Sequence, residues 1–142
     1  MAKTDKNGYW LFKQEPECYS YADLERDGQT VWDGITNSLA QRNLRQVRAG
    51  DRVLLYHTGK EKAVVGEMVV VAGPRPAAEG AKEVVVEVAP VRRLTPVPLG
   101  RIKEDALLRA WELVRLPRLS VVPMTPAQWA RVVELSGMAV AE

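Results

Sequence analysis

The sequence contains very few residues that could hold a metal or form a covalent bridge. Its 142 residues include one cysteine, Cys18, and one histidine, His57. A single cysteine excludes an internal disulfide, and a lone histidine leaves too few soft ligands for a zinc site. We therefore predict no metal site and no cofactor, although this count leaves an all-oxygen magnesium site open.

Long apolar runs are also missing. Apolar runs such as residues 63–65 and 84–86 are much too short to cross a bilayer, and the polar residues 1–7 precede no signal-peptide core. We predict a soluble, cytoplasmic protein with no membrane contact. We expect residues 1–7 to form a disordered tail.

Motifs of the common catalytic classes are absent as well. His57 can be combined on paper with Ser20, Ser38 or Ser120, but no Gly-x-Ser-x-Gly elbow surrounds these serines. No glycine motif of the kind that cradles nucleotide phosphates occurs either. The sequence therefore favours a protein that is not an enzyme.

The composition is that of an ordered globular protein. Apolar residues make up 46% of the chain and charged residues 27%, and 142 residues are about the size of one domain. We predict a single domain over 1–142, with its core in 9–136, and a monomer.

Net charge is only +2, but two segments, residues 42–52 and 92–118, are rich in arginine and lysine. They suit contact with a few phosphates, and they equally suit a solvated helix face.

Apolar patterning predicts an α+β fold. Strands are expected at residues 9–12, 52–57, 63–71, 83–94 with a break at Pro90, and 119–122, with a mobile loop at 73–80. Helices are expected after Ser20, over 37–48, over 101–114 with Leu107, Trp111 and Val114 on one face, and over 126–135. The simplest architecture is a mixed, mostly antiparallel, barrel-like sheet with peripheral helices.

Two helix starts carry local signals. Ser20 with Asp23 resembles a capping box that Gly28 would terminate, and Thr125 with Gln128 forms another, with Pro126 at the first helical position. Periodicity places the tryptophans at positions 10, 111 and 129 in the core.

Polar and aromatic residues gather at the ends of the expected elements. Binding groups often collect at such positions over a rigid sheet, and a planar base needs an aromatic face together with fixed donors and acceptors. The group comprises Lys13, Gln14 and Glu15 after the first strand, Trp32, Asp33 and Gly34 before the second helix, Asn37 at its start, Tyr56, His57 and Thr58 at a hairpin turn, and Arg118, Leu119 and Ser120.

Each of these residues also has an ordinary structural interpretation. Trp32 could be a core tryptophan and Asn37 a helix N-cap, while Lys13 and Glu15 could form a surface pair. Arg118 could bind a nearby carboxylate. Composition and spacing alone therefore lead only to a soluble α+β domain with a polar pocket.

Several motifs together resemble the EVE domain family. They occur in the family's order and span the chain from residue 9 to about residue 135. The motifs are YWLFKQEP at 9–16, WDGI at 32–35, Asn37, NLR at 43–45, GD at 50–51, YH at 56–57, VG at 65–66 and RLSV at 118–121 with Pro123.

The resemblance implies a PUA-like β-barrel that binds nucleic acid and recognises a modified base, foremost modified cytosine in DNA. Trp32 would form the wall of the base pocket. Lys13, Gln14, Glu15 and Asn37 would read base edges. Neighbouring groups would be Tyr56, His57 and Ser120, and the phosphate contacts would be Arg42, Arg45 and Arg118.

Two other interpretations stay open: an RNA-binding module of general PUA-like type, and an enzyme acting on a nucleotide-like ligand through Lys13, Glu15 and His57. The chain departs from the family pattern at Gln14, where Ser or Thr is usual, and at Thr36, Ser38 and Gln41. The resemblance therefore does not carry the ligand's identity with it.

Overall fold

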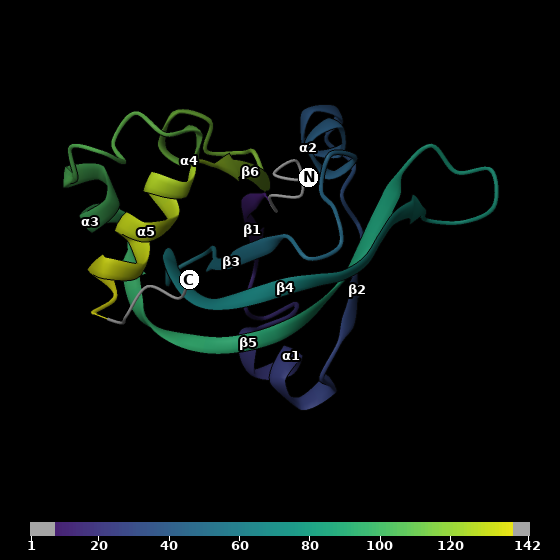
Figure 1. Cartoon of the computed structure of the whole chain (residues 1–142), viewed down its shortest axis with the longest axis horizontal. Helices are drawn as coiled ribbons and strands as arrows, with labels where there is room; N and C mark the ends of the chain where they lie inside the picture. The colour runs from purple at the N-terminus through teal and green to yellow at the C-terminus, as the bar shows by residue number, and fades with distance from the viewer. Residues whose placement is uncertain (1–7, 138–142) are drawn as a thin grey trace, which may run out of the picture.

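The computed structural model describes residues 8–137, so the predicted tail at 1–7 lies outside the described residues (Figure 1). The elements follow one another as β1 (Tyr9–Gln14), α1 (Tyr21–Asp27), β2 (Thr30–Trp32), α2 (Ser38–Leu44), β3 (Arg52–His57), β4 (Ala63–Pro76), β5 (Val84–Pro98), α3 (Leu99–Glu104), α4 (Glu112–Arg115), β6 (Val121–Met124) and α5 (Pro126–Leu135).

One six-stranded sheet in the order β2-β5-β4-β3-β1-β6 organises the fold. β1 and β3 are parallel, and every other neighbouring pair is antiparallel. This confirms the predicted mixed, mostly antiparallel α+β fold. Within residues 8–137 the outer strands β2 and β6 do not pair with each other, so the barrel is only partly formed.

The β4–β5 hairpin is longer than the sequence indicated. The predicted loop at 73–80 begins later, at residue 77, because β4 runs to Pro76, and the predicted break at Pro90 is wrong, because β5 runs unbroken to Pro98. Proline has no N–H to donate to a neighbouring strand. The chain accommodates its prolines at register shifts, one beside Met68, which is opposite Pro90, and one between Ala72 and Arg75. The resulting ribbon curves under the rest of the sheet (Figure 1).

The helix expected over 37–48 ends earlier, at Leu44. Tighter turns follow it, in which the Gln46 N–H donates to Asn43 and the Val47 N–H donates to Leu44. These turns place Val47 fully inside the core. Val47 is therefore buried by these tighter turns and not by the last helical turn that the periodicity predicted.

The single helix expected over 101–114 is wrong. Asp105 is extended and ends α3, and its carboxylate accepts a hydrogen bond from the Leu107 N–H. The chain then turns so that Leu108 is buried while Leu107 is 49% exposed. A second short helix, α4, begins only after Trp111.

The last strand is shifted by two residues relative to the predicted 119–122, because a turn in which the Leu119 N–H donates to Leu116 precedes it. β6 pairs antiparallel with β1, and Pro123 lies opposite Trp10. Proline is tolerated there because β6 is an edge strand.

Local signals at the helix ends are confirmed. The Ser20–Asp23 and Thr125–Gln128 capping boxes both form, and Gly28 ends α1 in the left-handed conformation. The tryptophans at 10, 111 and 129 are buried as predicted.

Glycine is required at one place in the core. A Cβ atom on Gly66 would overlap the ring of Tyr21, so the helix α1 can press this ring onto β4 only because residue 66 has no side chain.

Asp51 fastens the start of β1. Its carboxylate, 2% exposed, accepts hydrogen bonds from Gly8 N at 2.7 Å, Trp10 Nε1 at 2.9 Å and Arg48 N at 2.8 Å. A buried carboxylate is tolerated when N–H donors surround it in this way.

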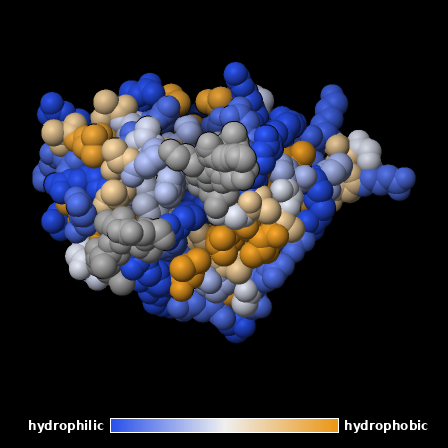
Figure 2. All heavy atoms as spheres, viewed as in Figure 1, coloured by the Kyte–Doolittle hydropathy of each residue, from blue (hydrophilic) through white to orange (hydrophobic). Residues whose placement is uncertain are grey.

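The molecule's surface is mixed. Figure 2 shows an apolar area over the middle of the β4–β5 hairpin within an otherwise largely hydrophilic face. No helix within the described residues is long and apolar enough to cross a membrane. In the same part of the chain, no three His, Cys, Asp or Glu side chains gather as metal ligands would.

Candidate functional site

The carboxyl end of β1 is the centre of the candidate site. In the parallel register with β3, Lys13 lies beside Tyr56 and Gln14 beside His57. Successive side chains of a strand point to opposite faces. Lys13 and Gln14 therefore border two different cavities.

The first cavity, which we call the Trp32 cavity, has a volume of about 730 Å³. It lies between the end of β1, the segment before α1, and β2. Its lining residues include two aromatic rings and two carboxylates but no lysine or arginine: Gln14, Cys18, Tyr19, Gln29, Thr30, Val31, Trp32, Asp33 and Glu87.

Trp32 belongs both to the core and to the wall of this cavity. It is 4% exposed, and its ring centroid lies 5.8 Å from that of Phe12 on β1. Tyr19 meets it edge-on, with 6.2 Å between centroids. The ring thus packs against Phe12 in the core, while its remaining surface closes one side of the cavity.

Hydrogen bonds fix the polar walls. The Tyr19 hydroxyl donates to Asp27 Oδ2 at 2.8 Å, and burial raises the pKa of Tyr19. Glu87 accepts from Gln29 Nε2 at 2.6 Å and pairs with Arg75 at 2.6 Å; these contacts, the first foremost, lower the pKa of Glu87. The carboxylate therefore stays ionised, and Gln29 is held across the cavity.

Gln14 has its donor group available. Its Oε1 accepts the backbone N–H of Glu15 at 2.9 Å, which fixes the orientation of the amide. The NH₂ end can then donate to a molecule in the cavity, since an amide carries two such donors.

The second cavity, the lysine cavity, measures about 310 Å³ and lies across β1 from the first. Lys13 Nζ donates to the Pro117 carbonyl at 2.8 Å and lies 5.8 Å from the centroid of the Tyr56 ring. Burial lowers the pKa of Lys13. The cavity is lined by Lys13, Tyr56, Thr58, Gly59, Lys62, Leu99, Lys103, Leu113 and Pro117.

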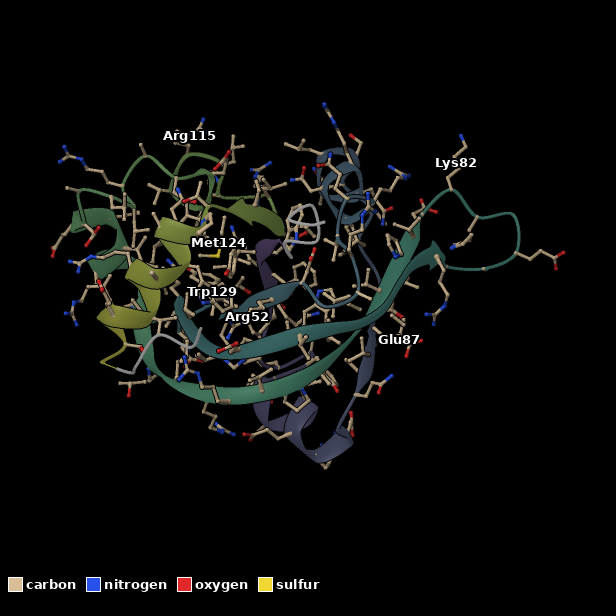
Figure 3. All side chains as sticks on the ribbon, viewed as in Figure 1. Arg52, Lys82, Glu87, Arg115, Met124 and Trp129 are labelled. Atoms are coloured by element: carbon tan, nitrogen blue, oxygen red, sulfur yellow. The ribbon has the colours of Figure 1, made fainter. Side chains whose placement is uncertain are left out.

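A third hollow, the arginine groove, measures about 290 Å³ and is lined by Asn37, Leu39, Arg115, Leu116, Pro117, Arg118 and Leu119. It shares Pro117 with the lysine cavity. Asn37 is the N-cap of α2, where its side chain accepts from the Ala40 N–H. Figure 3 places Arg115 far from Glu87 of the Trp32 cavity.

The structure divides the residues that the sequence had grouped as one base pocket. Gln14 and Trp32 border the Trp32 cavity, Lys13 and Tyr56 the lysine cavity, and Asn37 the arginine groove. The remaining three, Glu15, His57 and Ser120, line none of these hollows.

His57 has a structural environment of its own. It is 6% exposed, Nε2 accepts from the Tyr21 N–H at 3.1 Å, and Nδ1 lies 2.8 Å from Glu61 Oε1. Both ring nitrogens are thereby occupied. Glu15 is exposed, and the Ser120 carbonyl accepts the Lys13 N–H.

The predicted phosphate contacts are at the surface. Arg42, Arg45 and Arg118 are exposed, and Arg45 also donates to the Lys82 carbonyl at 3.0 Å. Arg118 borders the arginine groove. Other arginines of the two basic segments are paired inside the chain, since Arg52 and Arg92 both bind the buried Glu67.

Several residues that line the Trp32 cavity and the lysine cavity were not predicted from the sequence. Residues 29–31 directly precede Trp32, so their position was a usable signal. Glu87 comes into the cavity only because β2 pairs with β5, in the register Val31–Glu87. The β3–β4 turn brings Lys62 to the cavity of Lys13, and α3 brings Lys103 there. No local sequence pattern predicts either position.

Comparison with known proteins agrees with this fold. The profile of the EVE domain family matches residues 8–135, so the chain belongs to the EVE domain family and has a PUA-like fold. This confirms the resemblance carried by its motifs.

Relatives are found both by sequence and by structure. Mouse thymocyte nuclear protein 1 is 36% identical over 89 residues, which cover 50% of this chain and 39% of the mouse protein. A protein of known structure from Agrobacterium tumefaciens is 32% identical, with a TM-score of 0.89 over 94% of this chain and 96% of that one.

The human THYN1 protein has been crystallised in complex with 5-methylcytosine containing DNA. It is 25% identical to this chain, with a TM-score of 0.83 over 94% of this chain and 100% of the human one. Against the mammalian relatives matched by sequence, the matched part of this chain spans only about a third of their length, or slightly more.

Proposed function

We propose that this chain is a binding module that takes one modified base of a nucleic acid, foremost modified cytosine in DNA, into the Trp32 cavity. The observation that carries the proposal is this aromatic and polar cavity, in a fold shared with a protein crystallised on 5-methylcytosine containing DNA. The position of Trp32 in that cavity accords with the role implied by the family resemblance.

The cavity offers chemistry that suits cytosine. A cytosine presents an exocyclic N4 amino donor, which carboxylates accept well. Asp33 is an exposed carboxylate on the cavity wall, and the Gln14 NH₂ can donate to an acceptor on the base. Cys18 and Val31 supply apolar surface against which a methyl group could pack.

A base can reach such a cavity only after it leaves the helical stack. Flipping costs a few kcal/mol of lost stacking and pairing, which contacts in the cavity and along the backbone must offset. The absence of lysine and arginine from the Trp32 cavity fits a compartment for a base, with backbone contacts made elsewhere.

The proposal is of a binding module and not of an enzyme. Acid–base catalysis by Lys13, Glu15 and His57 would require these groups to converge on one ligand. Lys13 faces the lysine cavity, Glu15 is exposed, and His57 is buried with both ring nitrogens occupied.

Binding of matched oligonucleotides tests the proposal. Duplexes of one sequence would be unmodified or would carry one 5-methylcytosine or one N6-methyladenine, beside an RNA hairpin as the alternative partner, and their affinity would be measured by fluorescence anisotropy. We expect the 5-methylcytosine duplex to bind most tightly. Equal affinity for every oligonucleotide would refute the proposal, and tighter binding of the RNA hairpin would replace it with the RNA-binding alternative.

Two variants probe the cavity without damaging the core. Asp33→Asn and Gln14→Ala should each weaken binding of the 5-methylcytosine duplex by about five- to 150-fold, since a good polar pair to a base edge contributes about 1–3 kcal/mol. Their matched controls are Glu17→Gln and Gln46→Ala, which change exposed side chains of the same types outside the cavity. Unchanged affinity for this duplex in both cavity variants would show that the base binds elsewhere.

A further inference from the structure

The lysine cavity contains cations without anionic partners. Its three lysines come from separate elements: Lys13 from β1, Lys62 from the β3–β4 turn and Lys103 from α3. No aspartate or glutamate lines it. None of the ion pairs within residues 8–137 involves any of these three side chains.

This arrangement contrasts with the rest of the molecule, where cations near the sheet are paired. Arg52 and Arg92 share Glu67, Arg93 binds Glu25 at 2.7 Å, and Arg131 binds Asp105 at 2.7 Å. Partly buried charge is costly unless an opposite charge or several hydrogen bonds compensate it. Lys13 is half-buried, and its hydrogen bond to the Pro117 carbonyl uses one of the three donors of the ammonium group.

The backbone of Lys62 is itself unusual. Its φ of 46° lies in the left-handed region, where it is the one residue other than glycine within the described chain. The Lys62 carbonyl accepts the Leu99 N–H at 2.8 Å, which ties the turn to the end of β5. Strained backbone of this kind is concentrated at binding sites, because the surrounding structure must hold it in place.

Hydroxyl groups complete the lining. Thr58 and Tyr56 both border the cavity, and burial raises the pKa of Tyr56, so its hydroxyl remains a donor. Ammonium and hydroxyl donors converging without a carboxylate suit an oxyanion with several acceptor oxygens. A volume of about 310 Å³ admits a phosphate group.

We infer that the lysine cavity binds a backbone phosphate of the same strand whose base enters the Trp32 cavity. The inference rests on the proposed function for the identity of the strand, but the anion site stands on its own geometry. Lys13 and Gln14 are consecutive residues that face the two cavities, so the end of β1 would separate a phosphate from a base. Pro117 joins the lysine cavity to the arginine groove, which would continue the basic path.

The first arm of the test uses inorganic phosphate alone. Titrated into isotope-labelled protein, it should shift the amide signals of Thr58, Gly59 and Lys62, and the shifts should be lost in the Lys62→Gln/Lys103→Gln double variant. Both side chains are exposed, so their replacement should leave the fold intact, which the rest of the spectrum would verify. No shift at these amides, or the same shifts in the double variant, would overturn the anion site even where no DNA binds.

The second arm asks whether the phosphate belongs to DNA. The double variant should weaken binding of modified and unmodified oligonucleotides by the same factor and lower the slope of log affinity against log salt by about 0.9, as expected for one phosphate contact. A matched control, Lys60→Gln/Arg101→Gln, removes exposed charges from the same turn and the same helix without touching the cavity.

The two arms separate the possible failures. Phosphate shifts together with an unchanged DNA affinity would show that the cavity takes a free phosphate compound and would overturn the assignment to the strand. An equal loss of DNA affinity in the control variant would show that the loss comes from general surface charge, which would also overturn the assignment. If the wild-type protein binds no oligonucleotide, the proposed function fails, while the phosphate titration still decides the anion site.

Discussion

The two ends of β1 differ in how their polar groups are satisfied. At its start, the Asp51 carboxylate accepts three N–H groups of the chain itself, from Gly8, Trp10 and Arg48. At its end, Lys13 and Gln14 border two cavities of opposite character, one lined with lysines and the other with carboxylates. We call the start of β1 its closed end, because its polar groups are satisfied within the chain. We call the other end the open end, because Lys13 and Gln14 have donors available to a ligand. We therefore expect substitutions at the closed end to change stability and those at the open end to change binding.

Trp32 is the exception that tests this division most strongly, because it borders a cavity yet packs on Phe12. Trp32→Ala should lower the free energy of unfolding by about 3–5 kcal/mol, as large-to-small changes of buried aromatics do. Urea denaturation measures this. Trp32→Phe keeps an aromatic ring and should cost less. A loss below about 1 kcal/mol for the alanine variant would mean that the ring serves the cavity alone.

Asp51→Ala tests the closed end. It leaves three N–H donors at the start of β1 without their acceptor, and we expect the free energy of unfolding to fall by about 3 kcal/mol. Asp33→Ala, at an exposed carboxylate of the open end, should change it by less than about 0.5 kcal/mol. Denaturant titration of both variants gives the comparison, and similar losses would remove the distinction between the two ends.

Tyr21, on α1, should make the free energy of unfolding depend on pH. Its ring is buried, its hydroxyl donates to the Glu67 carbonyl at 2.8 Å, and burial raises its pKa to about 12. Because the unfolded chain releases this proton near pH 10, the protein should keep this contribution below pH 10 and lose about 2–3 kcal/mol between about pH 10 and 12.

Thermal or urea unfolding across this range should show the decline. Tyr21→Phe has no such proton and should flatten most of it, at the cost of the hydrogen bond to Glu67. Since burial also raises the pKa of Tyr19 and Tyr56, a smaller decline should remain. A decline of unchanged size in Tyr21→Phe would show that the Tyr21 hydroxyl is not its cause.

Features that depend on neighbouring residues could be predicted from the sequence. The capping boxes at Ser20 and Thr125 formed because each uses contacts only three residues apart. The strand at Tyr9 formed where its apolar residues indicated, and the motifs identified the family.

Features that depend on distant contacts could not. The helix over 101–114 broke because Asp105 binds Arg131 of α5 and turns Leu108 inward, a contact that no local periodicity contains. The candidate site divided for a similar reason. Adjacent residues of a motif, such as Lys13 and Gln14, point to opposite faces of a strand. Neighbours in the sequence therefore border different cavities.

Arg118 gives the smallest expected effect and the finest test of the open end. It is exposed beside the arginine groove, so Arg118→Gln should leave the free energy of unfolding within about 0.5 kcal/mol of wild type. If it contacts a phosphate, the salt dependence of DNA binding should fall by about 0.9 in log–log slope, equally for modified and unmodified duplexes. Arg109→Gln, also exposed but outside the groove, is the control. An unequal loss between the two duplexes would place Arg118 at the base instead of the backbone, and the arginine groove would then compete with the Trp32 cavity as the compartment that reads it.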